Sequence, residues 1–133
     1  AFRILDNMGA DAEDIATIIS AIGNHDEGTA FPVNPIAAAL ILADKTDVRR
    51  SRVRNRDFAN FDIHDRVNYA VQKATARISE DKTAFILNIH IDTEISAVMD
   101  YFEIFLKRML MCRRAAEMLG CRFKLTANGS KIC

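Results

Sequence analysis

The sequence has little of what builds disulfide-linked, membrane or polyanion-binding proteins. Its three cysteines, Cys112, Cys121 and Cys133, are widely spaced and form no CxxC pair, so neither a disulfide framework nor a zinc ribbon is expected. Reduced thiols of this kind indicate a cytoplasmic protein. No apolar run reaches about 18 to 20 residues, so we expect no transmembrane helix and no membrane partner. Because the formal net charge is zero, no global field favours nucleic acid, and we expect no nucleic-acid partner.

The composition is that of an ordinary soluble globular protein. Half of the 133 residues are hydrophobic and 27% are charged, enough for one domain, or one domain with a small appendage, around a real core. The chain opens "AFRILDNMGA", without Met and without a signal-peptide pattern, inside what looks like a helix. We therefore expect a fragment, the C-terminal part of a longer polypeptide.

The first part of the chain reads as helical. Isoleucines at three- and four-residue spacings in "AEDIATIISAIGN" predict a helix over 11–23, with Asp11 as its N-cap and Gly23 near its end. The segment "HDEGTAFPVNP" holds both prolines and reads as a loop. Asn34 as cap and Pro35 in the first turn predict a second helix, which we extend over 35–56.

The signals change after "RDFANFDIHDRVN", which reads as a linker or a boundary. "ATARIS", "AFILNIHID" and "RFKLTA" predict strands, and a long amphipathic helix is expected near 95–119 and closed by Gly120. The fold class is therefore α+β, with residues 1–57 as a helical part and 58–133 as a β-β-α-β module. Such a module suits regulation or oligomerisation, so a homo-oligomer remains one of the expected possibilities. The solvent face of its helix is expected to carry Lys107, Arg108, Arg113 and Arg114.

Asp44 is the first residue that could carry chemistry. It ends a helical run that is apolar nearly all round, where an ionised carboxylate is costly unless it is paired or binds a cation. A salt bridge to Lys45 or Arg49, or a simple exposed turn, is the alternative, and spacing alone favours it. His25 has the same ambiguity, because a histidine after a helix end can cap or pack as well as bind a metal.

A basic stretch follows Asp44. Helical spacing would place Lys45, Arg49 and Arg52 on one side of the predicted helix, next to that acid. Guanidinium forks bind phosphate oxygens in bidentate fashion, and a carboxylate for metal beside cations for phosphate suits metal-assisted phosphoester hydrolysis. One alternative is a solvated basic face. A weaker one is nucleic-acid binding by the arginine run, against which the zero net charge and the lack of interleaved aromatic residues count.

The segment "HDEGTAFPVNPIAAALILADKTDVRRSR" resembles the C-terminal half of an HD-superfamily metal-dependent phosphohydrolase domain. In that family a buried helix ends in an Ala-Asp pair followed by basic residues, and the Asp closes a metal site; Asp44 matches it. The branch with HD-GYP domains has a histidine-and-acid segment before its Gly/Tyr/Pro loop. Residues at comparable places here are His25, Asp26, Glu27, Gly28, Phe31 and Pro32. The chain departs from that loop where Phe31 replaces tyrosine and Ala30 replaces glycine.

The resemblance implies a divalent metal held by Asp44, with His25 as a further ligand, and a phosphate-containing small molecule bound by Lys45, Arg49 and Arg52. It implies a nucleotide or cyclic nucleotide as substrate. The family's His-Asp dyad lies upstream of the closing Asp, and neither His25-Asp26 nor His64-Asp65 fits that place, so we expect this stretch alone to be inactive. A non-catalytic regulatory or oligomerisation module derived from an HD domain is the alternative.

Overall fold

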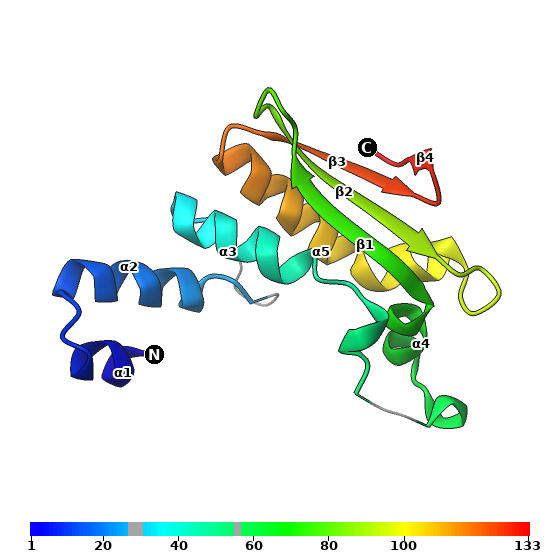
Figure 1. Ribbon diagram of the computed structural model, residues 1–133, viewed down its shortest axis with the longest axis horizontal. Helices are drawn as coiled ribbons and strands as arrows, with labels where there is room; N and C mark the ends of the chain where they lie inside the picture. The colour runs from blue at the N-terminus through cyan, green and yellow to red at the C-terminus, as the bar shows by residue number, and fades with distance from the viewer. Residues whose placement is uncertain (27–30, 55–56) are drawn as a thin grey trace.

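The computed structural model describes residues 1–26, 31–54 and 57–133, so Glu27, Gly28, Ala30 and Arg56 lie outside the described residues. Helices and a sheet are both present, which confirms the α+β class (Figure 1). The elements are α1 (Phe2–Asn7), α2 (Ala12–Gly23), α3 (Pro35–Lys45), η1 (Arg50–Arg52), η2 (Phe58–Asn60), α4 (Ile63–Ala70), β1 (Val71–Ile78), β2 (Ala84–Ile91), α5 (Val98–Met118), β3 (Arg122–Ala127) and β4 (Ser130–Lys131). Among the described helices, none is both long and apolar enough to cross a membrane.

The sheet is mixed and has the strand order β1-β2-β3-β4. β1 and β2 pair antiparallel, and β3 and β4 pair antiparallel. β2 and β3, which α5 connects along the chain, pair parallel. The register places Leu87 opposite Ala76 on one side and Leu125 on the other, so these residues share the inner face. α5 packs against this inner face, and no helix among the described residues covers the opposite face (Figure 1).

One hydrophobic core joins the helical segment to the sheet. Ile41 and Leu42 of α3 belong to the same buried cluster as Leu87 of β2, Phe105 of α5 and Leu125 of β3. The division between residues 1–57 and 58–133 stays a prediction, and the core crosses it.

Helices α2 and α3 begin where their caps predict. The Asp11 carboxylate accepts hydrogen bonds from the backbone N–H groups of Glu13 (2.9 Å) and Asp14 (3.0 Å), and the Asn34 side chain accepts one from Ala37 N–H (2.8 Å). The prediction of a helix over 11–23 is confirmed within one residue.

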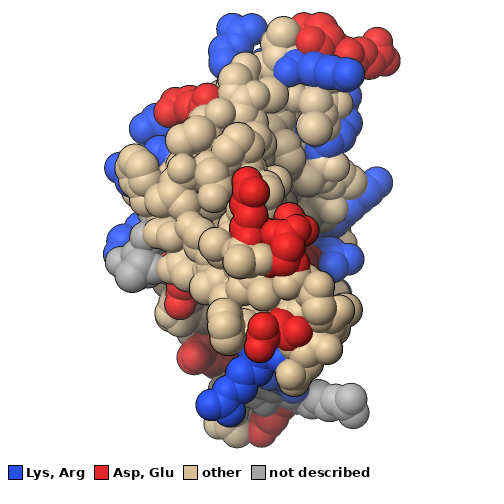
Figure 2. Space-filling model, turned by 90° about the vertical axis from the view of Figure 1, so that its left-hand side faces the viewer, with Lys and Arg blue, Asp and Glu red and all other residues tan. Residues whose placement is uncertain are grey.

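On the face that carries α1 and α2, acidic side chains gather in the middle and Lys and Arg lie toward the margins (Figure 2).

The prediction of one helix over 35–56 is wrong, because α3 ends at Lys45. The Thr46 hydroxyl donates to the carbonyl of Leu42 (2.6 Å) at the helix end, and the chain then turns so that Val48 enters the core, fully buried. Arg50 Nε donates to the Tyr69 carbonyl (2.7 Å), and its guanidinium lies 4.3 Å from the centre of the Tyr69 ring. These contacts bind the basic stretch to α4 instead of continuing the helix.

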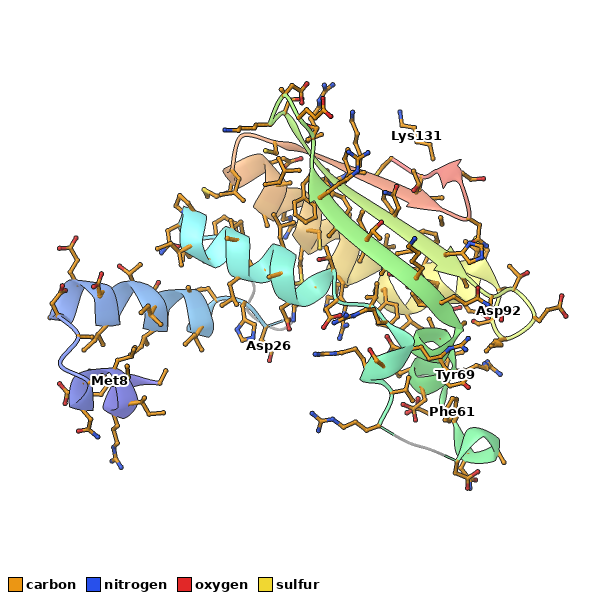
Figure 3. All side chains as sticks on the ribbon, in the orientation of Figure 1. Met8, Asp26, Phe61, Tyr69, Asp92 and Lys131 are labelled. Atoms are coloured by element: carbon orange, nitrogen blue, oxygen red, sulfur yellow. The ribbon has the colours of Figure 1, made fainter. Side chains whose placement is uncertain are left out.

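The second half follows its predicted order with shifted ends. Part of the predicted linker is α4, which is capped by Asp62, whose side chain accepts from Asp65 N–H (2.7 Å). The ring of Phe61, just before this helix, packs edge to face against the ring of Tyr69 within it (Figure 3). The long helix was expected from about 95 and begins at Val98. Before it, the backbone carbonyl of Asp92 accepts a hydrogen bond from Ser96 N–H (3.1 Å), which forms a separate turn. It is closed by Gly120 at a φ of 72°, as predicted.

Candidate functional site

Asp44 lies in the last turn of α3 and forms an ion pair with its neighbour. Lys45 Nζ is 2.7 Å from Asp44 Oδ2, and the two side chains are 6% and 35% exposed. The carboxylate is thus half-buried and already holds a cation from its own helix. The salt bridge to Lys45 was one of the sequence alternatives for Asp44, and it is present.

The environment of Asp44 keeps it ionised. Partial burial by itself would raise its pKa, but the hydrogen bond and charge of Lys45, with the charges of His25 and Arg108, hold the pKa below its ordinary value of 3.8. Lys45, His25 and Arg108, from different parts of the chain, therefore all act electrostatically on one carboxylate. Of these three residues, only Lys45 is next to Asp44 in the sequence.

His25 comes from the segment after α2. Its Nδ1 lies 2.5 Å from the Ile22 carbonyl oxygen, so Nδ1 is the donor and Nε2 is the nitrogen that could accept a proton or a metal. The structure therefore brings His25 within electrostatic reach of Asp44, the two residues that the resemblance marks as ligands. No direct bond between them is formed.

Arg108 of α5 was placed on the solvent face by the sequence analysis, and this placement is wrong. The residue is half-buried, with its guanidinium 4.9 Å from the centre of the Phe105 ring, and its charge acts on Asp44. A cation three residues after a core aromatic is one sequence signal for such a position. The electrostatic effect of Arg108 on Asp44 depends on the packing of α3 against α5, which no local pattern reveals.

Two titratable side chains of α5, Cys112 and Tyr101, are buried and stay protonated at neutral pH. Burial raises the pKa of the Cys112 thiol to about 12, so little reactive thiolate is present at neutral pH. Burial also raises the pKa of Tyr101, whose hydroxyl has no hydrogen-bond partner among the described residues.

Arg49 and Arg52 do not converge on Asp44. Arg49 Nε lies 2.6 Å from Asp47 Oδ1, and an Arg52 guanidinium nitrogen lies 3.4 Å from Asp47 Oδ2. Both arginine side chains are more than half exposed. Because α3 ends before them, the shared helical side that sequence spacing predicted for Lys45, Arg49 and Arg52 does not exist.

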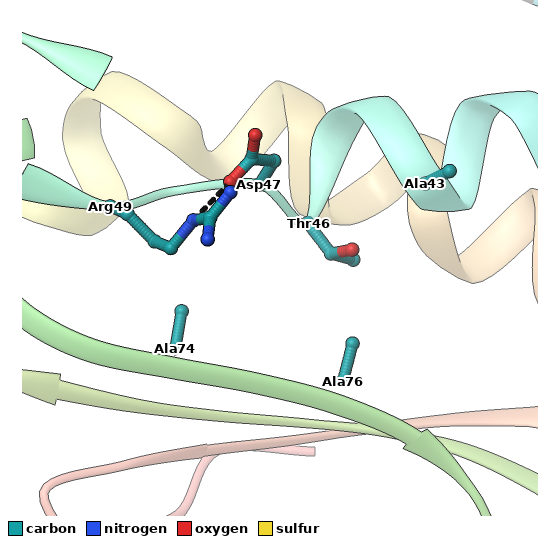
Figure 4. Close-up of a pocket in the computed structure, with 6 residues that line it drawn as sticks. All are labelled: Ala43, Thr46, Asp47, Arg49, Ala74 and Ala76. Atoms are coloured by element: carbon teal, nitrogen blue, oxygen red, sulfur yellow. Dashed lines mark hydrogen bonds and ion pairs between the residues drawn. The ribbon is translucent and has the colours of Figure 1, made fainter. Parts of the chain in front are cut away.

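Arg49 nevertheless lines a cavity of about 320 Å³ between the end of α3 and β1 (Figure 4). Ala74 and Ala76 form its sheet wall, Thr46 and Asp47 lie opposite, and the Asp47–Arg49 pair stands at one end. Small side chains on both walls leave this space open. Asp44 is not among the lining residues, since consecutive side chains leave a helix about 100° apart.

The described residues do not form a complete metal centre. No group of three or more His, Cys, Asp and Glu side chains is gathered within the described ranges. Asp44 offers one carboxylate whose Oδ2 is taken by Lys45, and three or more ligands are needed for a transition-metal site.

Comparisons with family models, curated proteins and solved structures found no match.

Proposed function

We propose that this chain is part of an HD-type metal-dependent phosphohydrolase acting on a phosphoester of the nucleotide or cyclic nucleotide class. The observation that carries the proposal is the half-buried, ionised carboxylate of Asp44 at the end of the buried helix α3. His25 lies close enough to act on it, which supports the pair of ligands that the resemblance implies. An acid kept ionised at such a place suits cation binding better than simple solvation.

The residues present do not fit a whole metal site, so its remaining ligands would have to come from outside the described residues. What the chain itself supplies is a charge arrangement. Lys45 and Arg108 hold the Asp44 carboxylate ionised, and a divalent ion would have to displace the Lys45 ammonium from Oδ2. A divalent ion and the Lys45 ammonium would therefore compete for the same carboxylate oxygen.

Arg49 and Arg52 are the proposed phosphate-binding groups. They share one carboxylate, Asp47, so the three side chains together keep a net positive charge, and Asp47 and Arg49 line the cavity beside β1. That cavity, at about 320 Å³, is at the lower end of the range for small-ligand pockets. Phosphate oxygens would replace Asp47 as the acceptors of the two guanidinium groups.

Titration with Mn²⁺, followed by its electron paramagnetic resonance signal, tests the metal part. The chain should bind Mn²⁺ weakly, Asp44→Asn should lose this binding, and Asp47→Asn should keep it. Equal Mn²⁺ affinity in the wild-type chain and Asp44→Asn would sink the metal assignment.

Binding of inorganic phosphate tests the other part. Removing one charged hydrogen-bonding partner costs on the order of 1.5–3 kcal/mol, so Arg49→Ala and Arg52→Ala should each weaken phosphate roughly ten- to a hundredfold. Arg114→Ala, an exposed arginine on α5, is the matched control. Unchanged phosphate affinity in both variants would mean that the arginines serve only Asp47.

A non-catalytic regulatory or oligomerisation module is the second candidate. It is favoured by the fact that Asp44 and Asp47 are already neutralised by cations of the same chain. Leu106 (53% exposed) and Leu110 (37%) of α5 also line an apolar groove with Ile132 (45%). No Mn²⁺ binding, together with a dimer that Leu106→Glu dissociates, would decide for this candidate.

A further inference from the structure

The open face of the sheet concentrates positive charge in a protein whose net charge is zero. The four strands contain no Asp or Glu. Alternation and register place five cations on the outer face or at its edge, all exposed: Lys73, Arg77, Arg122, Lys124 and Lys131. None of the five forms an ion pair with any residue that the structure describes. Lys131 points away from the helices on the far side of the sheet (Figure 3).

The arrangement of these cations is broad and regular. Arg77 and Lys124 flank Ile86 on successive strands, about 10 Å apart, and Lys73 lies about 13 Å from Arg77 along β1. A single phosphate group could contact one or two of them at most. A chain of phosphates lying across the sheet could contact all five.

The middle of the face offers hydrogen-bonding groups. Thr75, Asn88 and Thr126 form one row across three strands and line a shallow cavity of about 340 Å³. The Thr126 hydroxyl donates to Asn88 Oδ1 (2.5 Å), which leaves the Asn88 amide N–H groups as donors toward the outside. Such groups suit sugar hydroxyls and base edges between phosphate contacts.

We propose that this face, defined by the five cations and the polar row, binds a single strand of nucleic acid through its phosphates. The zero net charge of the whole chain conceals this surface, because the compensating acids lie outside the strands, many of them on the face with α1 and α2 (Figure 2). Asp81 in the turn between β1 and β2 is near enough for its charge to interact with that of Lys124. The outer face presents no Phe, Tyr or Trp for base stacking. Binding is therefore weak, on the order of 10⁻⁴–10⁻⁶ M, largely independent of sequence and strongly salt-dependent. The proposal does not rest on the Asp44 site.

The test is fluorescence anisotropy of a labelled oligouridylate of about 15 nucleotides, titrated with the whole chain between about 50 and 200 mM salt. With five phosphate contacts, the logarithm of the binding constant should fall against the logarithm of salt with a slope of about −3.5. The triple variant Lys73→Glu, Arg77→Glu, Lys124→Glu should bind at least about tenfold more weakly and have a slope near −1.4, from two remaining contacts.

The matched control reverses three exposed cations of α5: Lys107→Glu, Arg113→Glu and Arg114→Glu. It changes the net charge by the same amount and should keep the wild-type slope. Circular dichroism checks both folds, and replacing the same three sheet residues by Gln carries the test if the reversed variant does not fold.

Equal weakening by the two triple variants would overturn the proposal, since net charge alone would explain it. Absence of saturable binding at the lowest salt would also overturn it. So would tighter binding of a labelled polyglutamate, which would make the partner an acidic polypeptide. Sedimentation at the same salt tests whether a second copy of the chain binds this face. If the protein self-associates, the sheet variant abolishes that association and no RNA is bound, the partner of the face would be the acidic α1–α2 side of another molecule.

Discussion

The ion pair between Lys45 and Asp44 makes the sharpest stability prediction. Lys45 is 4% exposed, and among the described residues its ammonium is held by Asp44. Asp44→Asn leaves a buried ammonium without its counter-ion. A hydrogen bond to a charged group is worth about 1.5–3 kcal/mol. Because the Asp44 side chain is 35% exposed and water can partly replace it, we expect a loss of about 1.5–2 kcal/mol.

Asp47→Asn is the matched control for this experiment. It makes the same chemical change in an acid that binds Arg49 and Arg52, whose side chains are 58% and 57% exposed. Exposed pairs contribute about 0–1 kcal/mol. Urea unfolding at pH 7 should therefore separate the variants, with a midpoint lower by about 0.5–1 M for Asp44→Asn and a smaller change for Asp47→Asn.

The pH dependence gives the sign of the effect. The folded-state pKa of Asp44 is lowered, so its stabilisation is fully present above the ordinary value of 3.8 and is lost as pH falls through the lowered pKa. The difference between wild type and Asp44→Asn should shrink in that acidic window. Adding Lys45→Met should restore much of the stability at pH 7, because it removes the buried charge. Equal losses in Asp44→Asn and Asp47→Asn, or no rescue by Lys45→Met, would refute this reasoning.

Three further changes test other parts of the structure. Thr46→Val removes the hydroxyl that donates to the Leu42 carbonyl, and should lower the free energy of unfolding by about 0.5–1.5 kcal/mol in urea titrations; no loss would mean that this bond does not hold the helix end. Tyr101→Phe should leave thermal stability unchanged or raised, because its hydroxyl is buried without a described partner, and a clear loss would reveal one. Iodoacetamide should modify the exposed Cys133 of the native protein and spare Cys112, whose pKa is about 12, as mass spectrometry of the alkylated chain would show; early labelling of Cys112 would contradict its burial.

Local signals in the sequence were sufficient for most element positions. Asp11 and Asn34 mark their helix starts because cap hydrogen bonds involve only neighbouring residues. The alternation in "AFILNIHID" and the run "RFKLTA" gave β2 and β3 nearly to the residue, since one face of each strand is buried. β1 begins earlier than predicted, at Val71, because it follows α4 directly.

The end of α3 could not be read in the same way. The basic stretch after Lys45 has no strong apolar period, so helix and irregular structure were equally compatible with it. What decides is long-range: Val48 is buried in the core, and Arg50 binds Tyr69, a residue 19 positions away. Because α3 ends at Lys45, Arg49 pairs with Asp47, and the predicted convergence of Arg49 on Asp44 is wrong.

The candidate site shows the same limit. The pair of Asp44 and Lys45 was foreseeable because the residues are adjacent, whereas Arg108 joins them only through the packing of α3 on α5. The cationic sheet face likewise needs the strand register, because its members are spread over all four strands. Net charge and single-strand patterns cannot reveal it.

Metal-dependent phosphodiester hydrolysis, measured for Asp44→Asn beside Asp47→Asn, tests the proposed function most directly. If Asp44 is a metal ligand, Asp44→Asn should abolish metal-dependent turnover, while Asp47→Asn should keep it and change at most the affinity for substrate, because its carboxylate only holds Arg49 and Arg52. Full metal-dependent activity in Asp44→Asn would contradict the account, and the Asp44–Lys45 pair would then be a structural salt bridge.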